Sequence, residues 1–151
     1  MGLSTRAIAE SAVRGGRGDH VVTLDYFGDR DQRAMVENFA LQRDFDLPFS
    51  AEGLLHACQN SILADVEAVV YVSNLENYPD VVEALAQDRV LLGNSPATLR
   101  RVRDWRTLRT VCREEGISCP TTLFPGEESR ADPALPWLRK PIRSGGGRGV
   151  R

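Results

Sequence analysis

The residues best suited to chemistry lie near the C-terminal end of the chain, where a single lysine precedes a run of glycines. Lys140 is the only lysine beside 18 arginines, and four of the 13 glycines fall within residues 145–149. Glycine is costly to order on folding, but its bare backbone lets N–H groups approach phosphate oxygens closely. Ser144 adds a hydroxyl donor and Lys140 a compact ammonium group. This pattern indicates a phosphate-binding loop.

The spacing of this loop differs from two common phosphate-binding motifs. No Gly-Lys-Ser/Thr sequence closes the run, so it is not a Walker A loop, and its glycines lack the GxGxxG spacing. Arg143, Arg148 and Arg151 raise the net charge of residues 139–151 to +5, with no acidic residue among them. A flexible, basic, glycine-rich tail is the structural alternative to a binding loop.

Charge is divided unevenly along the 151 residues. Residues 1–99 carry 7 arginines against 15 acidic residues, whereas residues 100–151 carry 12 basic residues against 6 acidic ones. Such a division is typical of a nucleic-acid-binding tail, a site for an anionic ligand, or two surfaces that attract each other. Trp105 is the single aromatic residue among the arginines of residues 100–113, whereas binding of single-stranded nucleic acid uses several aromatic side chains for base stacking. We therefore interpret these arginines as a solvated helix face, partly offset by the acidic charge of residues 1–99, and we expect no nucleic-acid partner.

The overall composition is that of a globular protein. Hydrophobic residues make up 42% and charged residues 26%, which excludes a disordered or fibrous chain. No apolar run is long enough to span a membrane, and residues 1–6 lack the core of a signal peptide. The three cysteines form no CxxC pair, which favours a reducing compartment. We expect a cytoplasmic protein with no membrane partner.

Strand and helix patterns alternate over residues 1–94 and predict an open, mostly parallel α/β sheet. Helices are expected over residues 4–15, 31–42, 50–63 and 79–87, and strands over residues 20–27, 66–72 and 89–92. A fold of this kind opens with a strand, yet the chain begins at the turn Gly2-Leu3-Ser4. Either a first strand precedes Met1, or another element takes its place in the sheet.

The remaining residues follow a different pattern. Ser95 and Pro96 can begin a helix, Asp104 divides it from a second one, and Gly116 ends the second. A strand or an extended passage through Pro120 is expected over residues 117–123. A strand is expected over residues 135–142, and it would carry Lys140.

The C-terminal passage resembles a known family. Residues 138–151, with Lys140, Ser144, Gly145, Gly146, Gly147, Arg148 and Gly149, resemble the lysine and glycine-rich loop of the ATP-grasp superfamily, in the style of biotin carboxylase and related carboligases. Residues 91–96 and 104–120 resemble the helices that open the family's ATP-binding domain and the Gly-Ile-x-x-Pro strand after them.

The resemblance implies a domain organisation and a reaction. Residues 1–94 would form a Rossmann-like pre-ATP-grasp domain, and residues 95–151 the incomplete N-terminal portion of an ATP-grasp domain. The seven residues named above would bind ATP, which activates a small carboxylate as an acylphosphate for attack by an amine or a similar nucleophile. A homodimer is compatible with this organisation.

The chain also departs from the family's pattern. Trp105 follows Asp104 where the family often has a second ATP-contacting lysine. The family's Mg²⁺ ligands lie downstream of the glycine loop, so the chain would be the N-terminal part of a longer ligase and would not catalyse the reaction alone. Two alternatives remain: a nucleotide- or dinucleotide-binding Rossmann-type module without ligase activity, and a non-catalytic interaction domain with a basic tail.

Weaker candidate sites lie in the first 94 residues. Ser4, Thr5 and Arg6, at the start of a predicted helix, could bind a substrate anion, or could simply cap that helix. Asp25 lies at the end of a predicted strand, as a ribose-binding acid would, but the glycine-rich turn of such sites is missing. His20 and His56 have no third ligand at metal spacing, so we expect no metal site.

Overall fold

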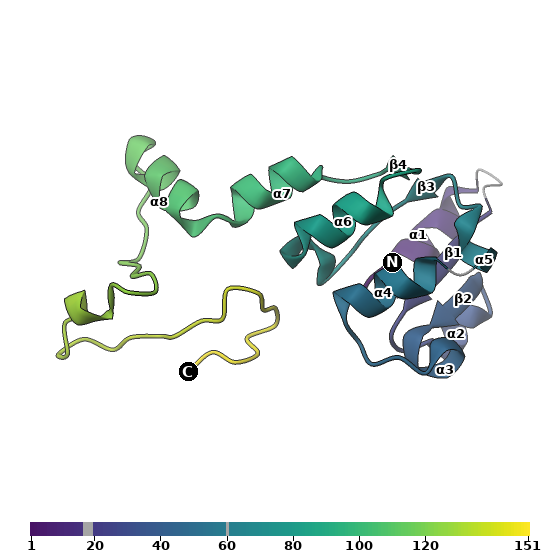
Figure 1. Cartoon of the computed structure of the whole chain (residues 1–151), viewed down its shortest axis with the longest axis horizontal. Coiled ribbons are helices and arrows are strands. Elements are labelled where there is room, and N and C mark those ends of the chain that lie inside the picture. The colour runs from purple at the N-terminus through teal and green to yellow at the C-terminus, as the bar shows by residue number, and fades with distance from the viewer. Residues whose placement is uncertain (17–19, 60) are drawn as a thin grey trace. The chain divides into compact units, whose positions relative to one another are not determined.

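The structure is a computed structural model that describes residues 1–16, 20–59 and 61–151, without the side chains of Ser61 and Ile62. The chain divides into two compact units, Met1–Leu99 and Arg100–Arg151 (Figure 1). The protein is mixed α/β, with short parallel strands in the first unit. None of the described helices combines the length and apolar character needed to cross a membrane.

The first unit contains two pairs of parallel strands. Strand β1 (Val22–Asp25) pairs with β2 (Glu37–Ala40), with Val22 opposite Glu37. Strand β3 (Ala68–Val69) pairs with β4 (Val90–Leu91), with Ala68 opposite Val90.

The first three residues connect these two pairs. The N–H of Gly2 donates to the carbonyl of Leu24 in β1 (3.2 Å), and the carbonyl of Met1 accepts from the N–H of Val72, just after β3 (2.8 Å). Residues 1–3 thus lie between β1 and β3, and the order across the unit is β2, β1, residues 1–3, β3, β4. Residues 1–3 therefore lie where a first strand was expected, between β1 and β3, and not at an edge of the sheet.

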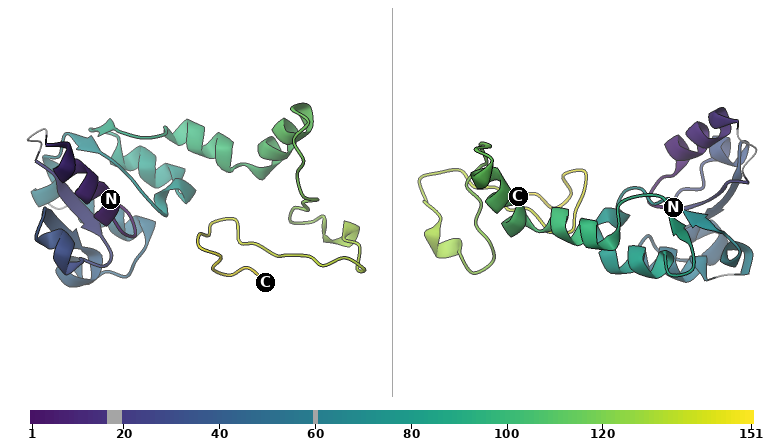
Figure 2. Two further views of the ribbon diagram at one scale, coloured as in Figure 1. Left: turned by 180° about the vertical axis from the view of Figure 1, so that it is seen from behind. Right: turned by 90° about the horizontal axis from the view of Figure 1, so that it is seen from above.

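Helices cover both sides of these strands. Helix α1 (Arg6–Gly15) lies on one side, and α4 (Ala51–Cys58) and α6 (Pro79–Leu85) lie on the other (Figure 2). Ser50 begins α4 as expected, since its hydroxyl accepts a hydrogen bond from the N–H of Gly53 (2.8 Å). Shorter elements complete the unit: α2 (Arg30–Arg33), α3 (Leu41–Phe45), α5 (Ser61–Ala64) and the 3₁₀ helix η1 (Leu75–Asn77). Helix α7 (Pro96–Arg103) spans the boundary between the two units.

The two faces of β1 are chemically different, because successive side chains of a strand point to opposite faces. Leu24 joins the apolar core beneath α4 and α6, whose largest fully buried members include Leu41, Leu54 and Leu85. Thr23 and Asp25 point to the other face, and both are buried. The polar face of this strand is therefore as fully enclosed as the apolar one.

The predicted helix over residues 31–42 is wrong. Its central residues form β2, flanked by the short helices α2 and α3. Asn38 is buried beside Thr23, and Ala40 is buried at the end of the strand, so pairing with β1 determines the conformation here. This is a tertiary contact, which overrides the local helical preference of the segment.

The second unit contains α8 (Trp105–Glu114), the 3₁₀ helix η2 (Glu128–Arg130) and extended or turning chain. Asp104 separates α7 from α8 as expected, because its carboxylate accepts hydrogen bonds from the N–H groups of Arg106 (3.1 Å) and Thr107 (3.3 Å). Of the strand or extended passage expected over residues 117–123, the strand is not formed, and the predicted strand over residues 135–142 is wrong. Pro120, Pro136 and Pro141 remove backbone donors from these segments, and neither is assigned to a strand.

The enclosed N-terminus leads to a first testable expectation. Burial lowers the pKa of the Met1 amino group to about 6, although the nearby Cys58 thiol and Asp25 carboxylate favour the charged form. In the unfolded chain this amine takes up its proton near pH 8, whereas in the folded chain it does so only near pH 6. The contribution of this amine to the free energy of unfolding is therefore fully present above pH 8 and is lost as the pH falls through 6. We expect the free energy of unfolding to decrease by about 2 kcal/mol between pH 8 and pH 6.

Urea unfolding followed by circular dichroism at several pH values measures this change. A His20→Asn, His56→Asn variant, which lacks both histidines of the chain, serves as the control and should keep the same slope. A free energy of unfolding that stays constant from pH 8 to pH 6 in both proteins would contradict the expectation.

Candidate functional site

The glycine-rich segment forms a loop closed by two backbone hydrogen bonds. The N–H of Arg139 donates to the carbonyl of Arg151 (2.8 Å), and the N–H of Arg151 donates back to the carbonyl of Arg139 (3.0 Å). This reciprocal pattern is that of a hydrogen-bonded pair in antiparallel chains. Residues 140–150 are therefore a defined loop that begins with Lys140.

Glycine is required at several positions of this loop. Gly146, Gly147 and Gly149 have φ values of 60°, 74° and 76°, in the left-handed region that other residues rarely adopt. A Cβ added to Gly149 would lie 2.9 Å from Cγ of Pro141, so the backbone also passes too close to the proline ring for a side chain. The Ser144 hydroxyl donates to the carbonyl of Arg148 (2.5 Å) and ties the two sides of the turn together.

The loop has open space and unused donors on its glycine side. A Cβ added to Gly145, Gly146 or Gly147 would meet no heavy atom within 4 Å. The N–H groups of Arg148 and Val150 donate within the loop, to the carbonyls of Gly145 and Gly147, both at 3.2 Å. No hydrogen bond from the N–H groups of Gly145, Gly146 or Gly147 is formed with any residue that the structure describes. These donors fit the oxygens of a phosphate chain, because successive free amides form a concave anion-binding surface.

The charged residues of the loop are exposed to solvent. Lys140 follows Arg139 directly and is exposed, as are Arg148 and Arg151. The prediction that a strand carries Lys140 is wrong, since its backbone is irregular. Its position relative to the glycines depends on the Arg139–Arg151 hydrogen bonds beside it.

The predicted anion site at the start of α1 already has an anionic partner within the chain. The N–H and hydroxyl of Thr5 both donate to Oδ2 of Asp25, at 3.3 and 2.7 Å. Arg6 forms ion pairs with Glu10 (3.2 Å) and Asp31 (2.5 Å), and Ser4 is exposed next to them. The N–H and hydroxyl of Thr5, which would have to donate to a substrate anion, are therefore already hydrogen-bonded to the Asp25 carboxylate in this structure.

Asp25 also belongs to a buried polar network that the sequence did not reveal. Its Oδ1 accepts from the N–H of Gly28 (2.9 Å), and Nε2 of Gln32 donates to the hydroxyls of Thr5 (2.7 Å) and Thr23 (2.8 Å). Gln32 is fully buried. The polar residues Thr23 and Asp25, which alternate with apolar residues in β1, were the local signal for this network. Their partners were not identified, because the sequence predicted one continuous helix over residues 31–42. The network ties β1 to α1 and α2, and it leaves no oxygen of Asp25 without a donor for a ribose to replace.

Comparison of the chain with protein-family models, with curated proteins and with solved structures found no match. Within residues 1–16, 20–59 and 61–151, no three His, Cys, Asp or Glu side chains are grouped so that they could hold a metal ion.

Proposed function

We propose that the chain binds ATP through residues 139–151, as the N-terminal part of an ATP-dependent carboxylate–amine ligase of the ATP-grasp type. The observation that carries the proposal is the closed loop with three unused glycine N–H groups, open space beside them and a net charge of +5. Backbone donors and basic side chains together are the usual means of holding a phosphate chain.

Each part of the loop has a distinct task in this proposal. Gly145, Gly146 and Gly147 present their N–H groups to phosphate oxygens, and Lys140 contributes an ammonium group at the entrance of the loop. Ser144 holds the turn through its bond to Arg148. ATP would supply the phosphoryl group that activates a small carboxylate, with Mg²⁺ neutralising phosphate charge through ligands outside the described residues.

The strand order of the first unit supports a Rossmann-like pre-ATP-grasp domain. Parallel strands in the order β2, β1, residues 1–3, β3, β4, with helices on both sides, correspond to the order 3-2-1-4-5 of a doubly wound fold. The alternative of a dinucleotide-binding module is less well supported, because Asp25, at the position of a ribose-binding acid, is buried and fully hydrogen-bonded to the protein.

The exposure of the side chains in the second unit supports the proposal that the chain is part of a larger ligase. None of residues 100–151, all of which the structure describes, is buried, and Trp105, Leu138 and Ile142 are 47%, 70% and 63% exposed. Exposed apolar side chains of this kind offer surface on which further polypeptide could pack. The remainder of an ATP-grasp domain would be such a partner.

Calorimetric titration of the chain with ATP, ADP, AMP and NAD tests the proposal. Because the loop binds phosphates, ATP and ADP should bind at least tenfold more tightly than AMP and NAD. Equal affinity for ATP and AMP would mean that the loop does not hold the phosphate chain.

Gly149→Ala provides a matched structural test of the loop. We expect it to weaken ATP binding at least tenfold, because alanine in a left-handed conformation costs about 1–2 kcal/mol and its Cβ would also collide with Pro141. Gly116→Ala is the control, since Gly116 also has a positive φ (67°) but open space around it and lies outside the loop. The same calorimetric titration should show less than a twofold change for the control, and equal effects of both substitutions would contradict a specific role for the loop.

A further inference from the structure

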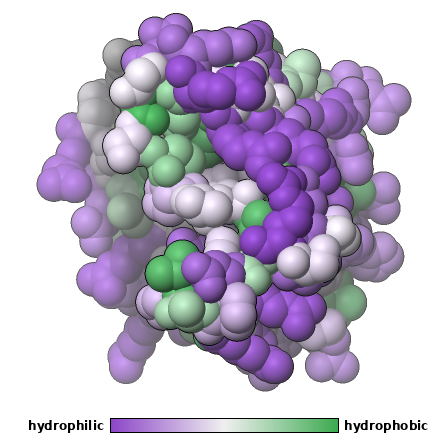
Figure 3. All heavy atoms as spheres, turned by 90° about the vertical axis from the view of Figure 1, so that its left-hand side faces the viewer, coloured by the Kyte–Doolittle hydropathy of each residue, from purple (hydrophilic) through white to green (hydrophobic). Residues whose placement is uncertain are grey.

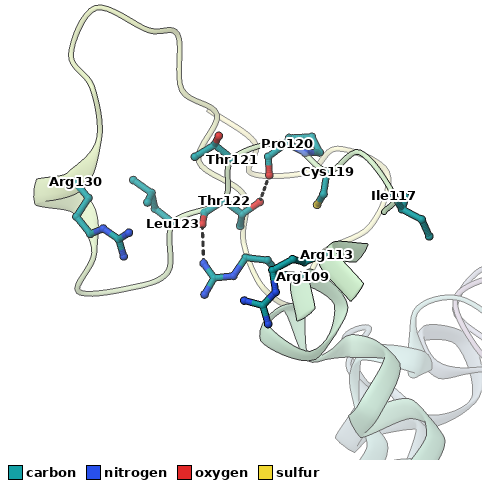
Figure 4. Close-up of a pocket in the computed structure, with 9 residues that line it drawn as sticks. All are labelled: Arg109, Arg113, Ile117, Cys119, Pro120, Thr121, Thr122, Leu123 and Arg130. Atoms are coloured by element: carbon teal, nitrogen blue, oxygen red, sulfur yellow. Dashed lines mark hydrogen bonds between the residues drawn. The ribbon is translucent and has the colours of Figure 1, made fainter. Parts of the chain in front are cut away.

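A second basic site lies in the unit Arg100–Arg151, in a pocket that shares no residue with the glycine loop. Its volume is about 320 Å³, and its walls are α8, residues 117–123 and η2 (Figure 4). Three arginines line it, Arg109 and Arg113 from α8 and Arg130 from η2, and none of its lining residues is acidic. We call it the arginine pocket. The volume lies at the lower end of the range for small-molecule sites, which begins near 300 Å³.

Arg109 is held in place at the wall of the pocket. Its Nη1 donates to the carbonyl of Thr122 (3.3 Å), and its guanidinium lies 4.6 Å from the centre of the Phe124 ring. Arg106 stacks over the same ring at 4.3 Å. A planar guanidinium held by stacking presents its remaining N–H groups in a fixed direction, which suits two-point binding of a carboxylate or phosphate.

One internal carboxylate compensates only part of the positive charge. Oε1 of Glu127 pairs with Nη1 of Arg130 (3.3 Å), while its Oε2 accepts from the N–H of Phe124 (2.9 Å). This backbone hydrogen bond, together with the nearby arginines, lowers the pKa of Glu127, which therefore remains charged at neutral pH. Arg113 forms no ion pair with any of the described residues. The arginine pocket thus retains an excess of two positive charges.

We propose that the arginine pocket binds a small molecule through a doubly charged oxyanion, either a phosphate group or a pair of carboxylates. Both chemistries match the guanidinium groups of Arg109 and Arg113, which Figure 4 shows on the same wall of the pocket. The site is separate from ATP binding by the loop, and it would serve an anionic substrate or effector. Figure 3 shows hydrophilic residues over much of one face of the chain, with smaller groups of hydrophobic residues between them.

Titration of the full chain with inorganic phosphate in 150 mM NaCl, followed by amide chemical shifts, tests this proposal. The expected result is a shift of Thr121, Thr122 and Leu123, with an affinity that falls at least fivefold in Arg113→Gln. Arg101→Gln, which removes a positive charge from α7, is the control and should change the affinity less than twofold. Shifts of residues 121–123 report on the arginine pocket and shifts of residues 145–147 on the loop, so failure of this site is distinguishable from failure of the ATP site.

Two further measurements complete the test. Competition by malonate would assign the pocket to carboxylates as well as phosphate, whereas its absence would restrict the pocket to phosphate. If Arg113→Gln loses helical circular dichroism, Arg113→Lys replaces it, and the loss of the planar fork should still weaken binding at least twofold. Equal weakening by Arg113→Gln and Arg101→Gln, or none by any Arg113 variant, would overturn the proposal.

Discussion

Asp25→Ala is expected to lower the free energy of unfolding of the first unit by about 3–5 kcal/mol. Asp25 is 1% exposed, and its carboxylate accepts hydrogen bonds from Thr5, Gly28 and Gln32. Removing the acceptor leaves several buried donors unpaired, and each such donor costs about 1–3 kcal/mol. Denaturant unfolding followed by circular dichroism measures the change.

Two further variants isolate the hydrogen bonds of Asp25 from its charge. Asp65→Ala removes an exposed carboxylate from the same unit and should change the free energy of unfolding by less than about 0.5 kcal/mol. Asp25→Asn retains the shape and one acceptor, and its effect should be intermediate. If Asp25→Ala and Asp65→Ala were equally stable, Asp25 would not organise this face of the unit.

Lys140→Ala is expected to weaken ATP binding ten- to a hundredfold. A charge-assisted hydrogen bond to phosphate contributes about 1.5–3 kcal/mol, and 1.4 kcal/mol corresponds to a factor of ten. Lys140→Arg should also lose much of the affinity, because a guanidinium is larger, planar and more weakly hydrated than an ammonium group. Calorimetry with wild type and both variants measures the effect.

Arg101→Ala is the control for this change, since Arg101 is an exposed arginine on α7, outside the loop. Its loss removes the same charge and should alter ATP affinity less than threefold at moderate ionic strength. If both Lys140 variants bound ATP as tightly as wild type, Lys140 would be an ordinary surface residue and the assignment would be wrong.

Local signals in the sequence predicted the starts of several helices well. The start of α4 at Ser50 and the division of α7 from α8 at Asp104 depend on side chains that cap the helix immediately following them. By contrast, β2 depends on pairing with β1, and the place of residues 1–3 depends on hydrogen bonds to Leu24 and Val72, which are distant in the sequence. Such contacts leave no local pattern.

The candidate site shows the same division between local and long-range information. Glycine content and the single lysine identified the loop, because these are properties of composition. The closure of the loop by Arg139 and Arg151 joins residues twelve positions apart. The hydrogen bond from the Thr5 hydroxyl to Asp25 likewise joins two elements that are distant in the sequence, and no spacing of residues indicates it.

The most direct test of the central claim is a titration of the ¹⁵N-labelled chain with ATP, observed at the backbone amides. The N–H groups of Gly145, Gly146 and Gly147 have no acceptor among the described residues, so phosphate binding should move their resonances strongly. We expect the largest shifts at these three amides, with saturation, and the loss of those shifts in Lys140→Ala. Shifts spread evenly over the arginines of α7 and α8, with the three glycine amides unmoved, would contradict ATP binding by this loop.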